Sequence, residues 1–226
     1  MSPLTIHPQR DVLLAVDVQN DFCPGGCLAV PRGDEVVAPI NQLMTLFSHV
    51  VLTQDWHPAG HRSFASAHPG RASYETIDLP YGPQILWPDH CLQGTFGADF
   101  HPRLDQAPAS MILRKGADPG IDSYSAFLEN DRVTPTGLAG YLRERGCTRV
   151  ILAGLAFDFC VLWSAEDARR LGFEAVVIED ACRALDVDGS MAQARARLRA
   201  IDVPSVASSA VAKAGAALDG SQCGPA

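Results

Sequence analysis

Three residues of different chemistry, Asp17, Lys115 and Cys160, each follow a short apolar run of the kind that forms a buried strand. A charge at the end of a buried strand is costly to hide unless it has a partner or a task. Cys160 opens a predicted helix, where the macrodipole favours a thiolate and unpaired backbone N–H groups can face an oxyanion. A cysteine nucleophile also needs a base and a nearby cation. Singly, each residue is more often a turn cap, a surface lysine or a packed core thiol; together they indicate nucleophilic catalysis.

A second group, Asp55, His57, His61 and His90, supplies one carboxylate and three imidazoles. These ligand types suit zinc, iron or manganese, and the set does not choose among them. The spacing matches neither the common zinc-finger patterns nor HExxH, so scattered surface histidines explain the residues equally well. The other histidines are assigned to the surface: His7, His49, His68 and His101.

Strand and helix patterns alternate along the chain. Short apolar runs typical of strands buried on both faces occupy residues 12–18, 50–53, 111–114, 149–154 and 174–178. Helices are predicted from near Ala38, between an N-cap at Thr134 and Gly146, over residues 160–171, and after a cap at Asp188. This alternation predicts an α/β fold with a mostly parallel sheet of about six strands and helices on both faces. Because ligands bind beyond the carboxyl ends of parallel strands, the three strand-end residues are expected to converge there.

We expect residues 1–226 to form one domain. Within it, residues 55–108 are irregular and rich in proline, glycine and histidine, which favours an ordered insertion that binds metal and substrate. Residues 208–226 are small and polar and are predicted to form a C-terminal tail with a frayed end.

Composition excludes several classes of protein. A net charge of −8 argues against a nucleic-acid binder, since phosphate neutralisation needs clustered lysine and arginine. No apolar run is long enough to cross a bilayer, and the N-terminus lacks a secretory signal, so a cytoplasmic location is expected.

The seven cysteines are expected to be reduced. Cys23 and Cys27 flank Pro-Gly-Gly and read as a turn rather than a redox or metal pair. The sequence does not decide whether the chain forms a homo-oligomer.

Several motifs resemble one known family in order along the chain. They are DVQNDF from Asp17, TQDWHPAGH, WPDHC, RKG, DSYSAF and GLAFDFC, and they extend from about residue 12 to 206. Together they resemble the nicotinamidases (pyrazinamidases) of the isochorismatase-like cysteine hydrolases. The resemblance implies that Cys160 is the nucleophile, Asp17 the general base and Lys115 the third member of a triad. It also implies a metal held by Asp55, His57, His61 and His90.

The resemblance further implies how a substrate is held. Phe22 and Trp87 match the aromatic walls of the family's pocket. Leu155 and Ala156 match a cis peptide that contacts substrate, and the N–H groups of Ala156 and Cys160 match an oxyanion hole. The sequence departs from the family at residues 157–159, where Phe-Asp-Phe replaces a more polar run. The departure leaves the triad intact but changes the polarity beside the cysteine.

The implied reaction is hydrolysis of nicotinamide to nicotinate and ammonia through a cysteine thioester, with pyrazinamide as a second substrate. The implied cofactor is one divalent metal ion, zinc as the first choice and iron or manganese as alternatives. The closest rival is an amidase of the same superfamily that acts on N-carbamoyl or ureido substrates, for which no such metal set is expected. Cys160 counts against an isochorismatase proper, which needs no thiol. A non-catalytic binding module would have a closed, structural metal site.

Overall fold

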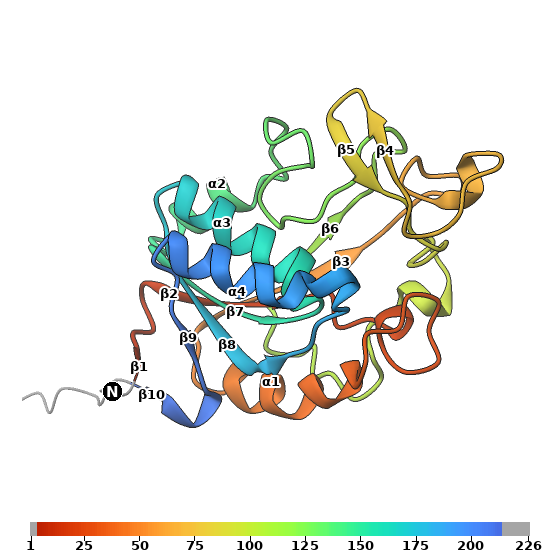
Figure 1. Ribbon diagram of the computed structural model, residues 1–226. Helices are drawn as coiled ribbons and strands as arrows, with labels where there is room; N and C mark the ends of the chain where they lie inside the picture. The colour runs from red at the N-terminus through yellow and green to blue at the C-terminus, as the bar shows by residue number, and fades with distance from the viewer. Residues whose placement is uncertain (1–3, 214–226) are drawn as a thin grey trace, which may run out of the picture.

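A six-stranded sheet, parallel throughout, forms the centre of the molecule, whose computed structural model describes residues 4–213 (Figure 1). The strands lie in the order β6-β3-β2-β7-β8-β9. Their bounds are β2 (Asp11–Val16), β3 (His49–Asp55), β6 (Met111–Lys115), β7 (Arg149–Gly154), β8 (Glu174–Cys182) and β9 (Ser205–Val206). Central strands β2 and β7 are buried along their whole length, as their nearly continuous apolar runs predict. The predicted α/β fold is confirmed.

Four α-helices cover the sheet, and Figure 1 shows α1 below it and α3 and α4 on the opposite side. They are α1 (Val37–Met44), α2 (Leu138–Glu144), α3 (Leu162–Arg170) and α4 (Ser190–Ala200). The predicted start of the first helix near Ala38 agrees with α1. Among residues 4–213, no helix is both long and apolar enough to span a bilayer.

Two predicted helix caps are wrong. The hydroxyl of Thr134 donates to Asp131 Oδ2 at 2.6 Å in a local turn, so α2 starts later, after Gly137. A short-range hydrogen bond of this kind competes with helix initiation. Asp188 lies one residue too early to cap α4, whose N-cap is Gly189. Its φ of 51° lies in the left-handed region, inside the short turn (Val187–Gly189) that precedes α4.

Two small sheets flank the central one. In one, β1 (Leu4–Ile6) pairs in parallel with β10 (Val211–Lys213), so the predicted tail is structured over its first residues. Residues 214–226 of that tail lie outside the described part of the chain. The other is an antiparallel hairpin of β4 (Thr76–Leu79) and β5 (Gly82–Ile85), which stands over the carboxyl edge of the central sheet (Figure 1).

The close approach of β2 and β7 depends on Gly154 at the carboxyl end of β7. It pairs with Val16, and a Cβ built on it would lie 2.1 Å from the Val16 carbonyl oxygen. Its φ of +124° is also one that other residues rarely adopt. A glycine is therefore required where these two strands deliver their last residues to the edge of the sheet.

Gly154→Ala should lower the free energy of unfolding by roughly 2–5 kcal/mol, because it adds both backbone strain and a steric overlap. Gly140→Ala is the matched control. Gly140 lies within α2 with open space around its Cβ position, so alanine there should stabilise the protein by about 0.5–1 kcal/mol. Urea denaturation of both variants measures the difference. Equal effects would show that the close contact with β2 does not require glycine at position 154.

Candidate active site

A buried ammonium lies at the carboxyl ends of the parallel strands, among the side chains that follow them. Lys115, the last residue of β6, has its Nζ 2.8 Å from Asp17 Oδ2 and 2.9 Å from Asp55 Oδ1. The same nitrogen donates to the Ser123 carbonyl at 2.9 Å and lies 3.5 Å from Cys160 Sγ. The sheet therefore brings together the acid, the ammonium and the thiol that follow three separate strands.

The backbone orients Asp17 towards this cluster. Asp17 follows β2 with a φ of 47°, and its N–H donates to Thr53 Oγ1. The Thr53 hydroxyl in turn donates to Asp17 Oδ1 at 2.6 Å. Among the described residues, Oδ2 has the ion pair with Lys115 but accepts no hydrogen bond of good geometry. One oxygen of the carboxylate is thus fixed in place, and the other keeps a lone pair for a proton.

Burial dominates the protonation of the thiol. It raises the pKa of Cys160 well above the usual value; Lys115 offsets part of this rise, and the charges of Asp17 and Asp55 add to it. Cys160 is also the fourth residue of a π-helical turn (Phe157–Val161) rather than the first of a helix. The predicted position at the first residue of a helix is therefore wrong, and burial favours the neutral thiol, as expected for a nucleophile that gives its proton to a base.

The pKa values of Asp17 and Lys115, the two charged neighbours of the thiol, suit the removal of its proton by a base. Burial raises the pKa of Asp17, and Lys115 only partly counters this effect. Burial would lower the pKa of Lys115, but Asp17 and Asp55 outweigh it, so this pKa is well above its usual value and the side chain stays an ammonium. Asp17 is consequently a stronger base than an exposed carboxylate.

A cluster of imidazoles adjoins the ammonium through Asp55. Asp55 Oδ2 lies 3.2 Å from His57 Nε2 and 3.4 Å from His90 Nε2. The other ring nitrogens are held by backbone, since His57 Nδ1 bonds to the Gly116 carbonyl and His90 Nδ1 to that of Pro88, both at 2.8 Å. Such bonds fix the tautomer and aim each Nε2 at a common point, as in metal sites. The three side chains form a candidate metal site.

The fourth predicted ligand, His61, belongs to a second triple with His57 and Asp122. Both of its ring nitrogens have partners: Nδ1 bonds to Ser63 Oγ at 2.7 Å and Nε2 to the Asp118 carbonyl at 2.8 Å. The structure thus brings the predicted set together around His57, but in two overlapping groups. Sequence reasoning missed Asp122 as a candidate ligand, although it opens the DSYSAF motif.

A small cavity connects the metal cluster to the thiol. Its polar lining comes from Asp55, His90 and Asp122, and Cys160 and Ala156 line it as well. The intervening walls are apolar or aromatic: Phe22, Leu28, Trp87, Tyr124, Phe159 and Leu185. Three of the predicted substrate-binding residues, Phe22, Trp87 and Ala156, therefore line this cavity. The predicted Leu155 does not line the cavity, because its side chain is fully buried.

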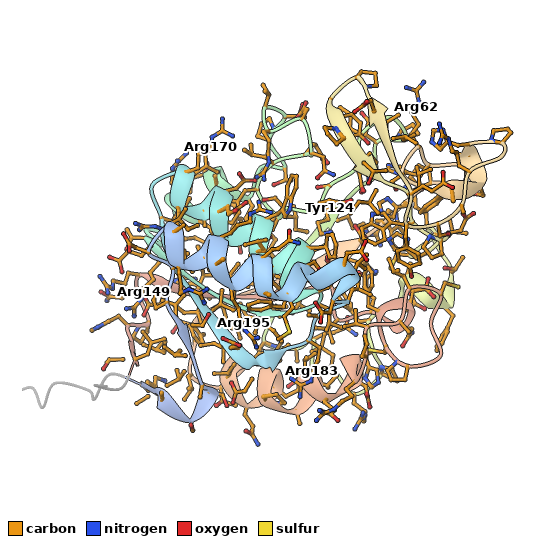
Figure 2. All side chains as sticks on the ribbon, in the orientation of Figure 1. Arg62, Tyr124, Arg149, Arg170, Arg183 and Arg195 are labelled. Atoms are coloured by element: carbon orange, nitrogen blue, oxygen red, sulfur yellow. The ribbon has the colours of Figure 1, made fainter. Side chains whose placement is uncertain are left out.

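Tyr124 is an unpredicted wall of this cavity, and Figure 2 shows it between α3 and the β4–β5 hairpin. Its hydroxyl accepts hydrogen bonds from Trp87 Nε1 and Gln84 Nε2, each at 2.9 Å. Gln84 Nε2 also donates to Asp122 Oδ2 at 2.8 Å. A buried aromatic hydroxyl with two donors is fixed in place, so this wall is rigid.

The unusual Phe-Asp-Phe run has a different role for each residue. Phe159 lines the cavity, whereas Phe157 is buried in the core. The Asp158 carboxylate accepts from the backbone N–H groups of Leu185 and Asp186, and from a serine hydroxyl at the start of α4. The charge in this run therefore anchors the segment that carries the cavity wall Leu185. Just before the run, the Leu155–Ala156 peptide bond is cis, as the resemblance implied.

Residues 11–207 match the isochorismatase domain family, which covers every strand of the central sheet. The chain belongs to the isochorismatase family. Within it, the chain is 54% identical to a nicotinamidase of Acinetobacter baylyi over 87% of this chain and 92% of that protein. The solved structure of an Acinetobacter baumanii nicotinamidase/pyrazinamidase shares 52% identity and covers 90% and 99% of the two chains, with a TM-score of 0.89.

Two further solved structures of isochorismatase-family relatives contain ligands. PnC1 from L. infantum, in complex with nicotinate, is 38% identical with a TM-score of 0.82, and covers 94% of this chain and all of its own. A pyrazinamidase of Pyrococcus horikoshii in complex with zinc is 31% identical with a TM-score of 0.72, covering 88% and 99%. These relatives bind a small pyridine ligand and a zinc ion, respectively.

The neutral thiol can be tested by alkylation across pH. Modification of Cys160 by iodoacetamide, followed by mass spectrometry of its peptide, should have a midpoint above the ordinary thiol pKa of about 8.5. Because the Asp17 charge raises the thiol pKa, Asp17→Asn should move the midpoint to lower pH. The exposed Cys27 serves as an internal check on the reagent, although burial and the Asp21 charge raise its pKa as well. A native midpoint at or below that of a free thiol would contradict this protonation state.

Proposed function

We propose that this protein is a nicotinamidase, which hydrolyses nicotinamide to nicotinate and ammonia and also accepts pyrazinamide. One observation supports this above all: a single small aromatic cavity is lined by the thiol of Cys160 and by Asp55 and His90 of the candidate metal cluster. A flat pyridine with a carboxamide carries an electrophilic carbon for the thiol and a ring nitrogen that can bind a metal. The identity to relatives named nicotinamidase supports the same activity.

In the first half of the proposed reaction, Phe22 and Trp87 flank the pyridine ring and hold the carboxamide carbon near Cys160. Asp17 takes the thiol proton as the sulfur attacks that carbon. The N–H groups of Ala156 and Cys160 donate to the oxyanion that forms. No described residue accepts a hydrogen bond from the Ala156 N–H, which leaves this donor free for the task.

In the second half, Asp17 returns the proton to the carboxamide nitrogen and the C–N bond breaks. Ammonia departs, and the acyl group remains on Cys160 as a thioester. A water molecule gives a proton to Asp17 and attacks the thioester; the C–S bond breaks, and Asp17 returns that proton to the sulfur. The acid leaves as nicotinate, and its proton goes to the released ammonia. Lys115 stays protonated throughout and stabilises the negative charge of the carboxylate and the developing thiolate. The reaction needs no other base, since Asp17 is restored to its carboxylate form.

We propose that Asp55, His57 and His90 hold one divalent metal ion, with zinc as the first choice and iron or manganese as alternatives. Three protein ligands of this kind are typical of catalytic rather than structural zinc sites. His61 and Asp122 would complete the surroundings, directly or through water. When bound, the metal would supply a Lewis-acidic contact for the ring nitrogen of the substrate and thereby orient it.

Cys160→Ala should reduce ammonia release from nicotinamide by at least about 10³-fold, because it removes the nucleophile. Cys147→Ala is the matched control: Cys147 is also a buried free thiol but lines no part of the cavity, so this variant should retain activity. A coupled ammonia assay on both proteins, with circular dichroism to check folding, measures the effect. Near-normal turnover by Cys160→Ala would reject the nucleophile assignment.

His57→Ala should lower the metal content per chain and weaken metal affinity by at least about tenfold, since His57 belongs to both candidate triples. Elemental analysis by inductively coupled plasma mass spectrometry measures the content. His68→Ala, at a histidine outside both triples, should leave it unchanged. If His57→Ala retains the full metal content, His57 is not a ligand.

A further inference from the structure

A second, larger cavity lies directly outside the catalytic one. It occupies about 410 Å³ between the β4–β5 hairpin and helices α3 and α4. Tyr74 and Trp163 give the outer cavity aromatic walls. Two side chains, Tyr124 and Phe159, line both cavities and therefore form the partition between them.

The two halves of this partition are held differently. Tyr124 is fixed through its hydroxyl by Trp87 and Gln84. Phe159 has no polar atom and is kept in place by edge-to-face packing, with ring centroids 5.0 Å from Trp87 and 5.8 Å from Tyr124. Phe159 is therefore the half that can be removed without leaving a buried hydrogen-bonding group unpaired.

The chemistry of the proposed substrate decides which of its atoms face the partition, so this inference rests on the proposed function. The carboxamide at C3 is held beside Cys160, and the ring nitrogen points to the cluster of Asp55 and His90. Both anchors lie on one side of the ring, so the C4–C6 edge faces the remaining walls, which include Phe159. A substituent at C5 would project furthest from both anchors.

We propose that Phe159 sets the size limit of the substrate, and that the outer cavity is a subsite for a second aromatic ring carried at C5 of a pyridine-3-carboxamide. With Phe159 in place, its ring stands between the two cavities, so a second ring at C5 would overlap it. Without it, the two cavities join, and a C5 phenyl group would lie between the aromatic side chains of Tyr74 and Trp163.

The test compares kcat/KM for 5-phenylnicotinamide with kcat/KM for nicotinamide. Phe159→Ala should raise this ratio by at least about tenfold over the native protein, and Phe159→Leu should raise it less. Val187, which lines only the outer cavity, provides the matched control. Val187→Trp added to Phe159→Ala should fill the subsite and return the ratio towards the native value, while Val187→Trp alone should leave nicotinamide turnover unchanged.

Two outcomes would overturn the proposal: an unchanged ratio in both Phe159 variants, or a raised ratio that Val187→Trp does not reverse. Should Phe159→Ala fail to fold, Phe159→Leu decides the matter. Absence of nicotinamide hydrolysis in the native protein would instead sink the proposed function. In that case, calorimetric binding of 5-phenylnicotinate to Phe159→Leu and to the native protein still tests the subsite, and equal affinities would reject it.

Discussion

The Asp55 carboxylate joins the two halves of the site, and the rest of the arrangement depends on how its oxygens are divided. Oδ1 lies 2.9 Å from the ammonium of Lys115, and Oδ2 faces His57 and His90. The Lys115 ammonium comes first among the favourable charges that hold the pKa of Asp55 well below its usual range despite burial. An acid this deeply buried stays ionised only with such partners. Loss of the Lys115 ammonium would therefore disturb the histidine cluster, and loss of the histidines would disturb the position of Lys115.

The sheet supplies this geometry through register and through one glycine. Asp55 and Lys115 are paired residues at the ends of neighbouring parallel strands, so their side chains reach the same edge together. The next residue, Gly116, has a φ of +65°, and a Cβ on it would lie 2.5 Å from His57 Cε1. Its carbonyl also holds the His57 ring. The glycine of the RKG motif thus lets the imidazole stand against the backbone beside the ammonium.

Sequence reasoning succeeded where periodicity and topology act together. Strands buried on both faces leave apolar runs, and parallel pairing forces their final residues to one edge, so the convergence of acid, lysine and thiol was predictable. Asp122 and Tyr124 were not predicted, because they enter the site through loops whose paths no local pattern specifies. The predicted helix start at Thr134 failed because its hydroxyl bonds to Asp131 instead, a choice that only the folded loop determines.

The apolar walls and the charged cluster also act on each other. The side chains proposed to enclose a pyridine ring, such as Phe22 and Trp87, give the space beside Cys160 apolar walls. The burial that comes with these walls raises the pKa of the thiol and of Asp17, which keeps the sulfur protonated at rest and strengthens the proposed base. A more polar wall would bind the ring less well and also weaken Asp17 as a base. Substrate affinity and proton transfer therefore share one physical origin, and a substitution in the walls should change both.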